Sequence, residues 1–165
     1  HKGALFSFSV LLAALGRYLS DGGDVFAHAA ALAAELTPPQ DTHGAAVAAH
    51  HQVGGARSEA LAGFPTSRKA AALLQTHDPL TVLLWLMAHT EDTNLYHRGG
   101  AEGAAFVKAQ AAAILAAPPK QRTALTQALD DALIDRWLSP GGCADLLALA
   151  LFLNNFFTAF HFFGK

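Results

Sequence analysis

The chain has 165 residues, of which 52% are hydrophobic and only 15% are charged. This composition excludes an intrinsically disordered protein and is typical of one domain with a large buried core. The formal net charge of −2 provides no overall basic field, so we expect no nucleic-acid partner. The single cysteine, Cys143, excludes an internal disulfide framework and fits a reducing, cytoplasmic compartment.

Alanine and leucine dominate, and no sustained alternation of apolar and polar residues predicts a strand. Loops with glycine or proline stop the predicted helices, and Asp24 and Asp78 are expected N-caps, the latter with Pro79 at the first helical position. No long linker divides the chain, so the sequence predicts an all-α fold, a single compact helical domain over residues 1–165. We expect eight or nine helices, drawn from residues 3–19, 24–36, 43–51, 57–62, 67–76, 79–95, 102–117, 120–137 and 143–162.

The most apolar stretch, "LLALALFLNNFFTAFHFF", covers residues 146–163. A membrane-spanning helix needs ~20 predominantly apolar residues. This stretch is shorter and contains Asn154, Asn155, Thr158 and His161. We interpret it as a core or subunit-facing helix, with a membrane helix as the alternative, and expect no membrane association. The early stretch "ALFSFSVLLAALG" lacks the basic lead and the cleavage site of a signal peptide.

Against this apolar background, polar residues gather in four stretches. They are "HKG" at 1–3, "GGARSEALAGFP" at 54–65, "EDTNLYHRGG" at 91–100 and "DDALIDRWLSPGGCADLLA" at 130–148. In the last two, a glycine pair precedes a strongly helical segment, and a helix start presents unpaired N–H groups that attract anions. One exposed helix start contributes only ~0.3–1 kcal/mol to anion binding, so a triphosphate would also need cations. The glycine pairs are Gly99–Gly100 and Gly141–Gly142, and the cations are Lys2, Arg57, Arg98 and Arg136. An ordinary loop with a helix cap remains the alternative for each pair.

Carboxylates lie in or beside the same stretches. They would repel a phosphate unless a cation stood between them, and Mg²⁺ commonly binds one or two carboxylates together with substrate phosphates. On one continuous helix, Asp92 and Asn94 would point ~200° apart, so a shared ligand requires the helix to loosen near Thr93. Glu91, Asn94 and Arg98 would share a face, with a surface salt-bridge stripe as the alternative. The acids are Glu59, Glu91, Asp92, Asp130, Asp131 and Asp145.

Other chemistry-bearing residues favour structural interpretations. His43, His50 and His51 could bind a metal, but without a carboxylate partner we interpret them as solvated. The pair His77–Asp78 lacks the further histidines of a metal phosphohydrolase. Cys143 starts a predicted helix but has no evident base beside it, so we expect a structural role. The aromatic cluster at residues 156–163 is interpreted as core or interface.

At these stretches the chain resembles the triphosphoribosyl-dephospho-coenzyme A synthases, which serve citrate lyase and malonate decarboxylase. The matching elements, in the family's order and spacing, are "HKGALFS", "GARSEALAGFP", "EDTNLYHRGG" and "LSPGGCADLLA". The resemblance implies an all-helical enzyme that joins ATP to 3′-dephospho-coenzyme A. The 2′-hydroxyl of the coenzyme attacks the anomeric carbon of ATP, adenine leaves, and the product is the prosthetic-group precursor of an acyl carrier protein.

The resemblance also carries over a set of site residues, and we infer their individual roles from their chemistry. Asp92, Asn94 and Asp145 would hold Mg²⁺, Glu59 or Asp130 would be the general base, and Asp92 is a further catalytic candidate. The residues expected to bind ATP are Lys2, Arg57, Asn94, Arg98, Gly99, Gly100, Arg136, Ser139, Gly141 and Gly142. The acyl carrier protein or its holo-transferase is a candidate partner.

The chain departs from the family pattern at two positions, with Ser58 in place of a glycine and Cys143 in place of a serine. Family chains extend upstream of "HKG", so we interpret residues 1–165 as the C-terminal part of the family's helical domain, without the N-terminal part. Two other functions fit the same residues. One is a helical Mg²⁺-dependent nucleotide or ADP-ribose hydrolase, and the other is a non-catalytic module that docks an acyl carrier through the C-terminal helix.

Overall fold

The computed structural model describes residues 2–37 and 54–160, and every regular element within them is a helix. The helices are α1 (Lys2–Asp21), α2 (Val25–Glu35), α4 (Ala56–Leu61), α5 (Pro65–Leu73), α6 (Pro79–His89), α7 (Thr93–Ala116), α8 (Pro119–Asp135) and α9 (Gly141–Phe160). This confirms the all-α prediction. The expected helix at 43–51, with His43, His50 and His51, lies outside the described residues.

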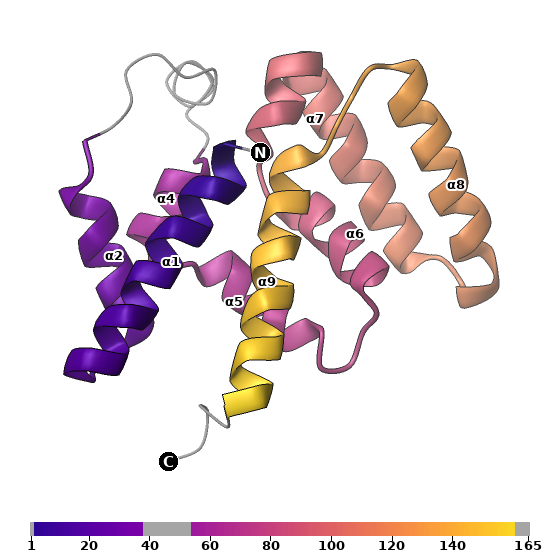
Figure 1. Ribbon diagram of the computed structural model, residues 1–165. Helices are drawn as coiled ribbons and strands as arrows, with labels where there is room; N and C mark the ends of the chain where they lie inside the picture. Colours follow the sequence, from indigo (N-terminus) through magenta and orange to yellow (C-terminus); the bar gives the residue numbers. More distant parts are fainter. Residues whose placement is uncertain (1, 38–53, 161–165) are drawn as a thin grey trace.

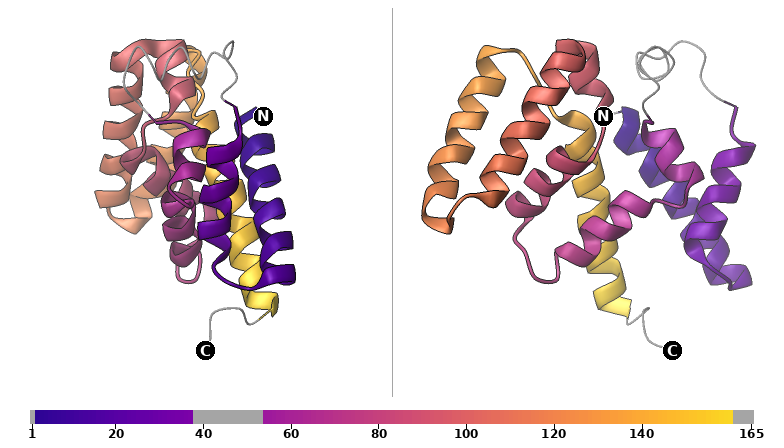
Figure 2. Two further views of the ribbon diagram at one scale, coloured as in Figure 1. Left: turned by 90° about the vertical axis from the view of Figure 1, so that its left-hand side faces the viewer. Right: turned by 180° about the vertical axis from the view of Figure 1, so that it is seen from behind.

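Helix α9 lies in the middle of the molecule, with α1, α2 and α4 on one side and α6, α7 and α8 on the other (Figures 1 and 2). Leu149, Leu153 and Phe157 pack into a hydrophobic cluster with α1, α2 and α4. On its other side, Cys143 and Ala150 join the cluster of α5, α6, α7 and α8. Because α9 is covered on two sides, its sequence is apolar around most of its circumference.

Helices α1 and α9 are each long and apolar enough to cross a membrane by length and composition. The same properties are found in core helices of proteins that do not span membranes. Here α9 packs against α1, α5, α6 and α7, and 28% of its apolar span is buried within the protein.

The prediction of one continuous helix over 79–95 is wrong, because polar side chains around Thr90 and Asp92 interrupt it. The hydroxyl of Thr90 donates to Leu86 O at 2.7 Å, and α6 ends at His89. The carboxylate of Asp92 then accepts from Asn94 N at 2.8 Å and caps α7. Such side-chain bonds to the backbone compete with helix continuation. The loosening near Thr93 that a shared site requires is therefore present.

Helix α7 changes direction at Gly100, whose φ of 62° and ψ of −163° are not helical. The segment before Gly100 continues from the α6–α7 loop, and the segment after it descends beside α6 (Figure 1). A positive φ is inexpensive only for glycine. The predicted helix start after the glycine pair is thus correct, while residues 93–99 form a separate short helical segment.

The predicted caps of α2 and α6 are confirmed. Asp24 accepts from Ala27 N at 2.7 Å, and Asp78 accepts from Thr81 N at 3.0 Å with Pro79 at the first helical position. The hydrogen bonds from Thr81 hold the pKa of Asp78 below its ordinary value. Asp78 is therefore a structural cap.

Candidate functional site

Four helices, α1, α4, α7 and α9, begin in one region at the top of Figure 1. The contacts between their first residues define what we call the helix-start cluster. A Cβ built on Gly3 would lie 3.7 Å from Ala56 Cβ, and one on Gly55 would lie 3.6 Å from Thr93 Cγ2. The cluster therefore joins the starts of α1, α4 and α7, and the side chains of Asp92 and Asp145 connect it to α9.

Asp92 links the starts of α7 and α9. Its Oδ1 accepts from Asn94 N, and its Oδ2 accepts from Cys143 N at 2.8 Å across the chain. The residue is only 4% exposed. A buried carboxylate between two helix N-termini is stabilised both by these hydrogen bonds and by the positive ends of the helix dipoles. Asp92 therefore fixes the position of α7 relative to α9.

Asp145 has the same role for α1. It lies in the first turn of α9, and its Oδ2 accepts from Ala4 N at 3.0 Å. Ala4 N is among the first N–H groups of α1, which have no partner within their own helix. The carboxylates of Asp92 and Asp145 thus hold α7 and α1 against the first turn of α9, and Lys2, the first residue of α1, is exposed.

The second glycine pair lies against the polar side chains of α7. A Cβ on Gly141 would lie 2.8 Å from Asn94 Nδ2, and one on Gly142 would lie 2.8 Å from Asp92 Oδ1. Of the first pair, Gly99 is packed against Leu138, whose Cδ2 would be 2.4 Å from an added Cβ. In this structure the close approach that glycine permits serves contacts within the protein. The predicted ligand role of Gly99, Gly100, Gly141 and Gly142 stays a prediction.

Replacing Gly142 by alanine is expected to destabilise the protein by about 1–3 kcal/mol, because the new methyl group would overlap the buried Asp92 carboxylate. Gly16, in α1, is the matched control, since an added Cβ there meets nothing within 4 Å. Gly16→Ala should raise stability by roughly 0.5–1 kcal/mol through the better helix propensity of alanine. Urea denaturation followed by circular dichroism measures both changes, and equal effects at the two positions would contradict this prediction.

Glu59 lies one turn into α4 and points toward the start of α5. Its Oε1 accepts from Thr66 N at 2.7 Å and from Ser67 N at 2.9 Å. The residue is half-buried. Glu59 is therefore an N-terminal cap for α5 supplied by another helix. Nearby Ser58 lies within α4 and does not have a positive φ, so its position does not require the glycine of the family pattern.

The predicted cations lie in two places. Lys2 and Arg57 are on α1 and α4, whose first residues form the helix-start cluster, and Arg57 Nη1 is buried without a hydrogen-bond partner among the described residues. Arg98 and Arg136 lie near the α8–α9 connection. Arg98 Nη1 donates to Trp137 O at 3.4 Å, and the Arg136 guanidinium lies 3.9 Å from the centre of the Phe106 ring.

Two further candidates lie on or after α8. Asp130 is exposed, and α8 packs chiefly against α7, so no described contact brings this carboxylate to the cluster. Ser139 is half-buried in the connection to α9. Conversely, Gly55 and Thr93 are neighbours at the cluster, since a Cβ built on Gly55 would lie 3.6 Å from Thr93 Cγ2, but they are not among the predicted site residues. Their position inside two of the polar stretches is the signal that would have pointed to them.

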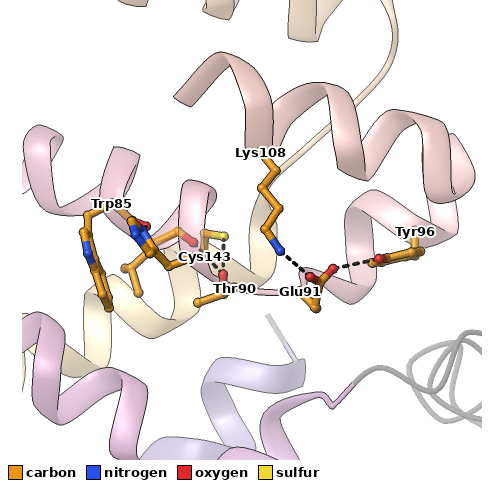
Figure 3. Close-up of polar contacts among 8 residues, drawn as sticks. Trp85, Thr90, Glu91, Tyr96, Lys108 and Cys143 are labelled. Atoms are coloured by element: carbon orange, nitrogen blue, oxygen red, sulfur yellow. Dashed lines mark hydrogen bonds and ion pairs between the residues drawn. The ribbon is translucent and has the colours of Figure 1, made fainter. Parts of the chain in front are cut away.

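Glu91 is not on a helical face with Asn94 and Arg98, because it precedes α7. Figure 3 shows that it accepts hydrogen bonds from Tyr96 and from Lys108, which reaches back from the far side of the kink. The hydrogen bond from Lys108, and then that from Tyr96, lowers the pKa of Glu91. The expected face-sharing stripe is thus replaced by a contact that holds the two segments of α7 together.

Lys108→Met should therefore reduce stability at pH 7 by less than about 1 kcal/mol, since both charged groups are partly exposed. A lowered carboxyl pKa stabilises the fold above the unfolded-state value, about 4.3, and this contribution is lost as pH falls through the folded-state value. The difference between the variant and the natural protein should shrink below about pH 4.3. Urea titrations at pH 7 and pH 3 measure this difference in stability. A difference that grows in acid would show that the contact between Lys108 and Glu91 is not its cause.

Cys143 has the structural role expected from the sequence. It is 1% exposed, and its Sγ lies 3.3 Å from Thr90 Oγ1 (Figure 3). Burial, and then the charge of Asp92, raises the pKa of the thiol far above its ordinary value. The group is therefore a neutral thiol, which is a poor nucleophile.

Residues 1–161 match the model of the ATP:dephospho-CoA triphosphoribosyl transferase family. The chain belongs to this family. It is 38% identical over 180 residues to a probable 2-(5″-triphosphoribosyl)-3′-dephosphocoenzyme-A synthase of Albidiferax ferrireducens, with 94% of the chain and 60% of that relative covered. It is also 38% identical over 187 residues to a Salmonella typhimurium protein with the same description, numbered 1, again with 94% of the chain and 60% of the relative covered.

A synthase of Pectobacterium atrosepticum is 39% identical over 184 residues, with 94% of the chain and 58% of that relative covered. The chain therefore spans about 60% of the length of the curated relatives it matches. No solved structure matches. The resemblance carried by the four polar stretches is thus confirmed at the level of the family.

Proposed function

We propose that this protein transfers the 5-triphosphoribosyl group of ATP to the 2′-hydroxyl of 3′-dephospho-coenzyme A, with release of adenine. Family membership supports this activity. The observation that carries it in the structure is the convergence of four helix starts, each within one of the polar stretches. Clustered N–H groups and positive helix ends provide the environment that a triphosphate requires.

Lys2 and Arg57 are the proposed phosphate-binding cations of the cluster. Arg57 supports this role most directly, because a buried guanidinium N–H without a partner costs free energy that an anionic ligand would recover. A second group of residues, near the α8–α9 connection, would bind another part of the substrates. It consists of Arg98, Arg136 and Ser139. Asn94, exposed at the start of α7, would contact the triphosphate or its metal ion.

The described residues contain no group of three His, Cys, Asp or Glu side chains arranged to hold a metal ion. They fit instead a Mg²⁺ ion that arrives with ATP, since such ions commonly use one or two carboxylates and keep phosphate and water ligands. Asp145 and Asp92 would supply the carboxylates, and Asn94 an amide oxygen. Each carboxylate oxygen has two lone pairs, so acceptance of one backbone N–H leaves capacity for a metal. The ion would neutralise phosphate charge.

The reaction breaks the bond between adenine and the anomeric carbon and forms a bond from that carbon to the 2′-oxygen of the coenzyme. Positive charge develops on the ribose, as in glycoside cleavage, and a nearby carboxylate stabilises it. A general base accepts the proton of the attacking hydroxyl. We propose Glu59 for this role, with Asp130 as the alternative. Glu59 is supported by its place on α4, one turn from the helix-start cluster.

The product would be the prosthetic-group precursor of an acyl carrier protein, so that protein or its holo-transferase is the proposed partner, in the cytoplasm. Incubation of the protein with ATP and dephospho-coenzyme A, followed by chromatography for free adenine, tests the activity. Adenine release that requires the second substrate supports the transferase. Release without it indicates a hydrolase, and no release from folded protein that binds ATP argues for a non-catalytic module.

A further inference from the structure

A cavity of about 900 Å³ lies between α5 and the second half of α9, with α2 at one edge. It is far from the helix-start cluster, because the cluster contacts the first turn of α9 and the cavity is lined by residues 153–158. At 1.5 Å per residue, Asp145 and Thr158 are separated by ~20 Å along the helix. The lining residues are Phe26, Pro65, Arg68, Lys69, Ala71, Ala72, Gln75, Leu153, Asn154, Phe157 and Thr158.

The floor of this cavity is apolar, and a hydrogen bond at its rim connects the two sides. Phe26 and Phe157 lie with ring centres 6.0 Å apart, and Leu153 is fully buried beside them. At the rim, Gln75, in the turn after α5, donates a hydrogen bond to Asn154 of α9. Both the volume and the mixture of an apolar floor with few polar groups are typical of small-molecule sites, which range from ~300 to ~1,000 Å³.

The charge of the lining has one sign. Arg68 and Lys69 are exposed, and no aspartate or glutamate among the residues that the structure describes lines the cavity. The ion pairs of the described residues are Arg17–Asp21 and Lys108–Glu91, so neither cation is neutralised there. Aromatic rings hold both in place, with the Arg68 guanidinium 4.2 Å from the centre of the Phe26 ring and Lys69 Nζ 5.1 Å from that of Trp85. The cavity thus carries Arg68 over its Phe26 ring and Lys69 beside the neighbouring Trp85, and two such cations next to an apolar surface complement an amphiphilic anion.

We propose that the cavity between α5 and α9 is a second binding site, for an elongated organic anion with an apolar body. The body lies along Pro65, Ala71 and Ala72, the accessible apolar lining above the buried rings, and the anionic head contacts Arg68 and Lys69. None of these residues belongs to the helix-start cluster, although Pro65 and Arg68 flank the two residues whose N–H groups Glu59 accepts. The proposed ligand is a carboxylate with an alkyl chain, or another anion that has a comparable apolar body.

Dodecanoate, kept below its micelle concentration, is the probe. Isothermal titration calorimetry should give a dissociation constant in the micromolar range, and backbone NMR signals of Gln75 and Asn154 should shift on binding. The double variant Arg68→Glu/Lys69→Glu should weaken binding at least tenfold. Lys120→Glu, which removes an exposed cation of α8, should change it less than twofold. Ala72→Trp, which fills the cavity from an exposed position, should abolish binding while the thermal midpoint stays within a few degrees.

A matched probe separates charge recognition from apolar association. Dodecyltrimethylammonium carries the same chain with a cationic head, and it should bind at least tenfold more weakly than dodecanoate. Equal binding of the two probes overturns the proposal, as does equal binding of dodecanoate by the Arg68→Glu/Lys69→Glu variant. Absence of binding to the folded natural protein also overturns it and leaves a protein segment as the occupant of the cavity. Because none of these measurements involves adenine release, their outcome is independent of the proposed transferase activity.

Discussion

Glu59→Gln is expected to lower the rate of adenine release by roughly 10²- to 10⁴-fold, the usual contribution of a general base. The amide oxygen of glutamine can still accept the N–H groups of Thr66 and Ser67, so α5 keeps a cap. ATP binding and the thermal midpoint should therefore change little. The substitution removes proton acceptance without removing the acceptor geometry, which separates the catalytic role of Glu59 from its role as a cap.

Two further variants complete this experiment. Glu59→Ala loses the cap as well, so it should cost about 0.5–2 kcal/mol of stability in addition to the rate. Asp130→Asn, on the exposed face of α8, should retain most activity. If Glu59→Gln is active and Asp130→Asn is not, the base is Asp130. Full activity of Glu59→Gln together with reduced stability would mean that Glu59 is only a cap.

The positions of most helices were predictable because proline, glycine and capping residues mark their ends. Asp24 and Asp78 are examples, since each precedes an apolar run and caps it as expected. The exception is the α6–α7 boundary. There the apolar periodicity favours a continuous helix, whereas Thr90 and Asp92 bond to the backbone and end it. The sequence gives only a weak signal that side-chain bonds to the backbone will end a helix. Here the tertiary contact of Asp92 with α9 decides the outcome.

The polar stretches were predictable as a set, but the partners of their residues were not. Lys2, Asp92 and Asp145, distant in sequence, gather around the first turns of α1, α7 and α9. The sequence does not reveal that both carboxylates bind the N–H groups of other helices, since such caps depend on packing. Nor does it reveal that Gly99 is packed under Leu138 and Gly142 under Asp92. A glycine that admits a ligand and one that admits a side chain look alike in sequence.

These contacts change how the two acids are interpreted. Asp92 and Asp145 hold the starts of α1, α7 and α9 together, so the positions of the N–H groups that these three helices offer to a ligand depend on them. Preorganised donors act only when they are fixed before the ligand arrives. A substitution at either acid is therefore expected to affect both stability and nucleotide binding, and the two effects must be measured separately.

Asp92→Ala is expected to destabilise the fold by about 3 kcal/mol, because it removes two hydrogen bonds to a charged group, each taken at about 1.5 kcal/mol, the low end of the usual range. Its burial leaves little access for water to replace those bonds. The thermal midpoint should fall by roughly 6–12 °C. Asp131→Ala is the matched control, since Asp131 is exposed on α8 and, among the described residues, accepts only from Gln127 at 3.1 Å, and it should change stability by less than about 0.5 kcal/mol.

Asp92→Asn tests the role of the charge at this position. One oxygen of the amide can accept from Cys143 N or from Asn94 N, while the NH₂ group would face the remaining backbone donor. The variant should therefore lose nearly as much stability as Asp92→Ala, although its side chain is almost the same size. Calorimetric midpoints for the three variants decide the matter. If the Asp92→Asn protein is stable but binds ATP poorly, the main role of Asp92 is to hold the ligand and not to join the helices.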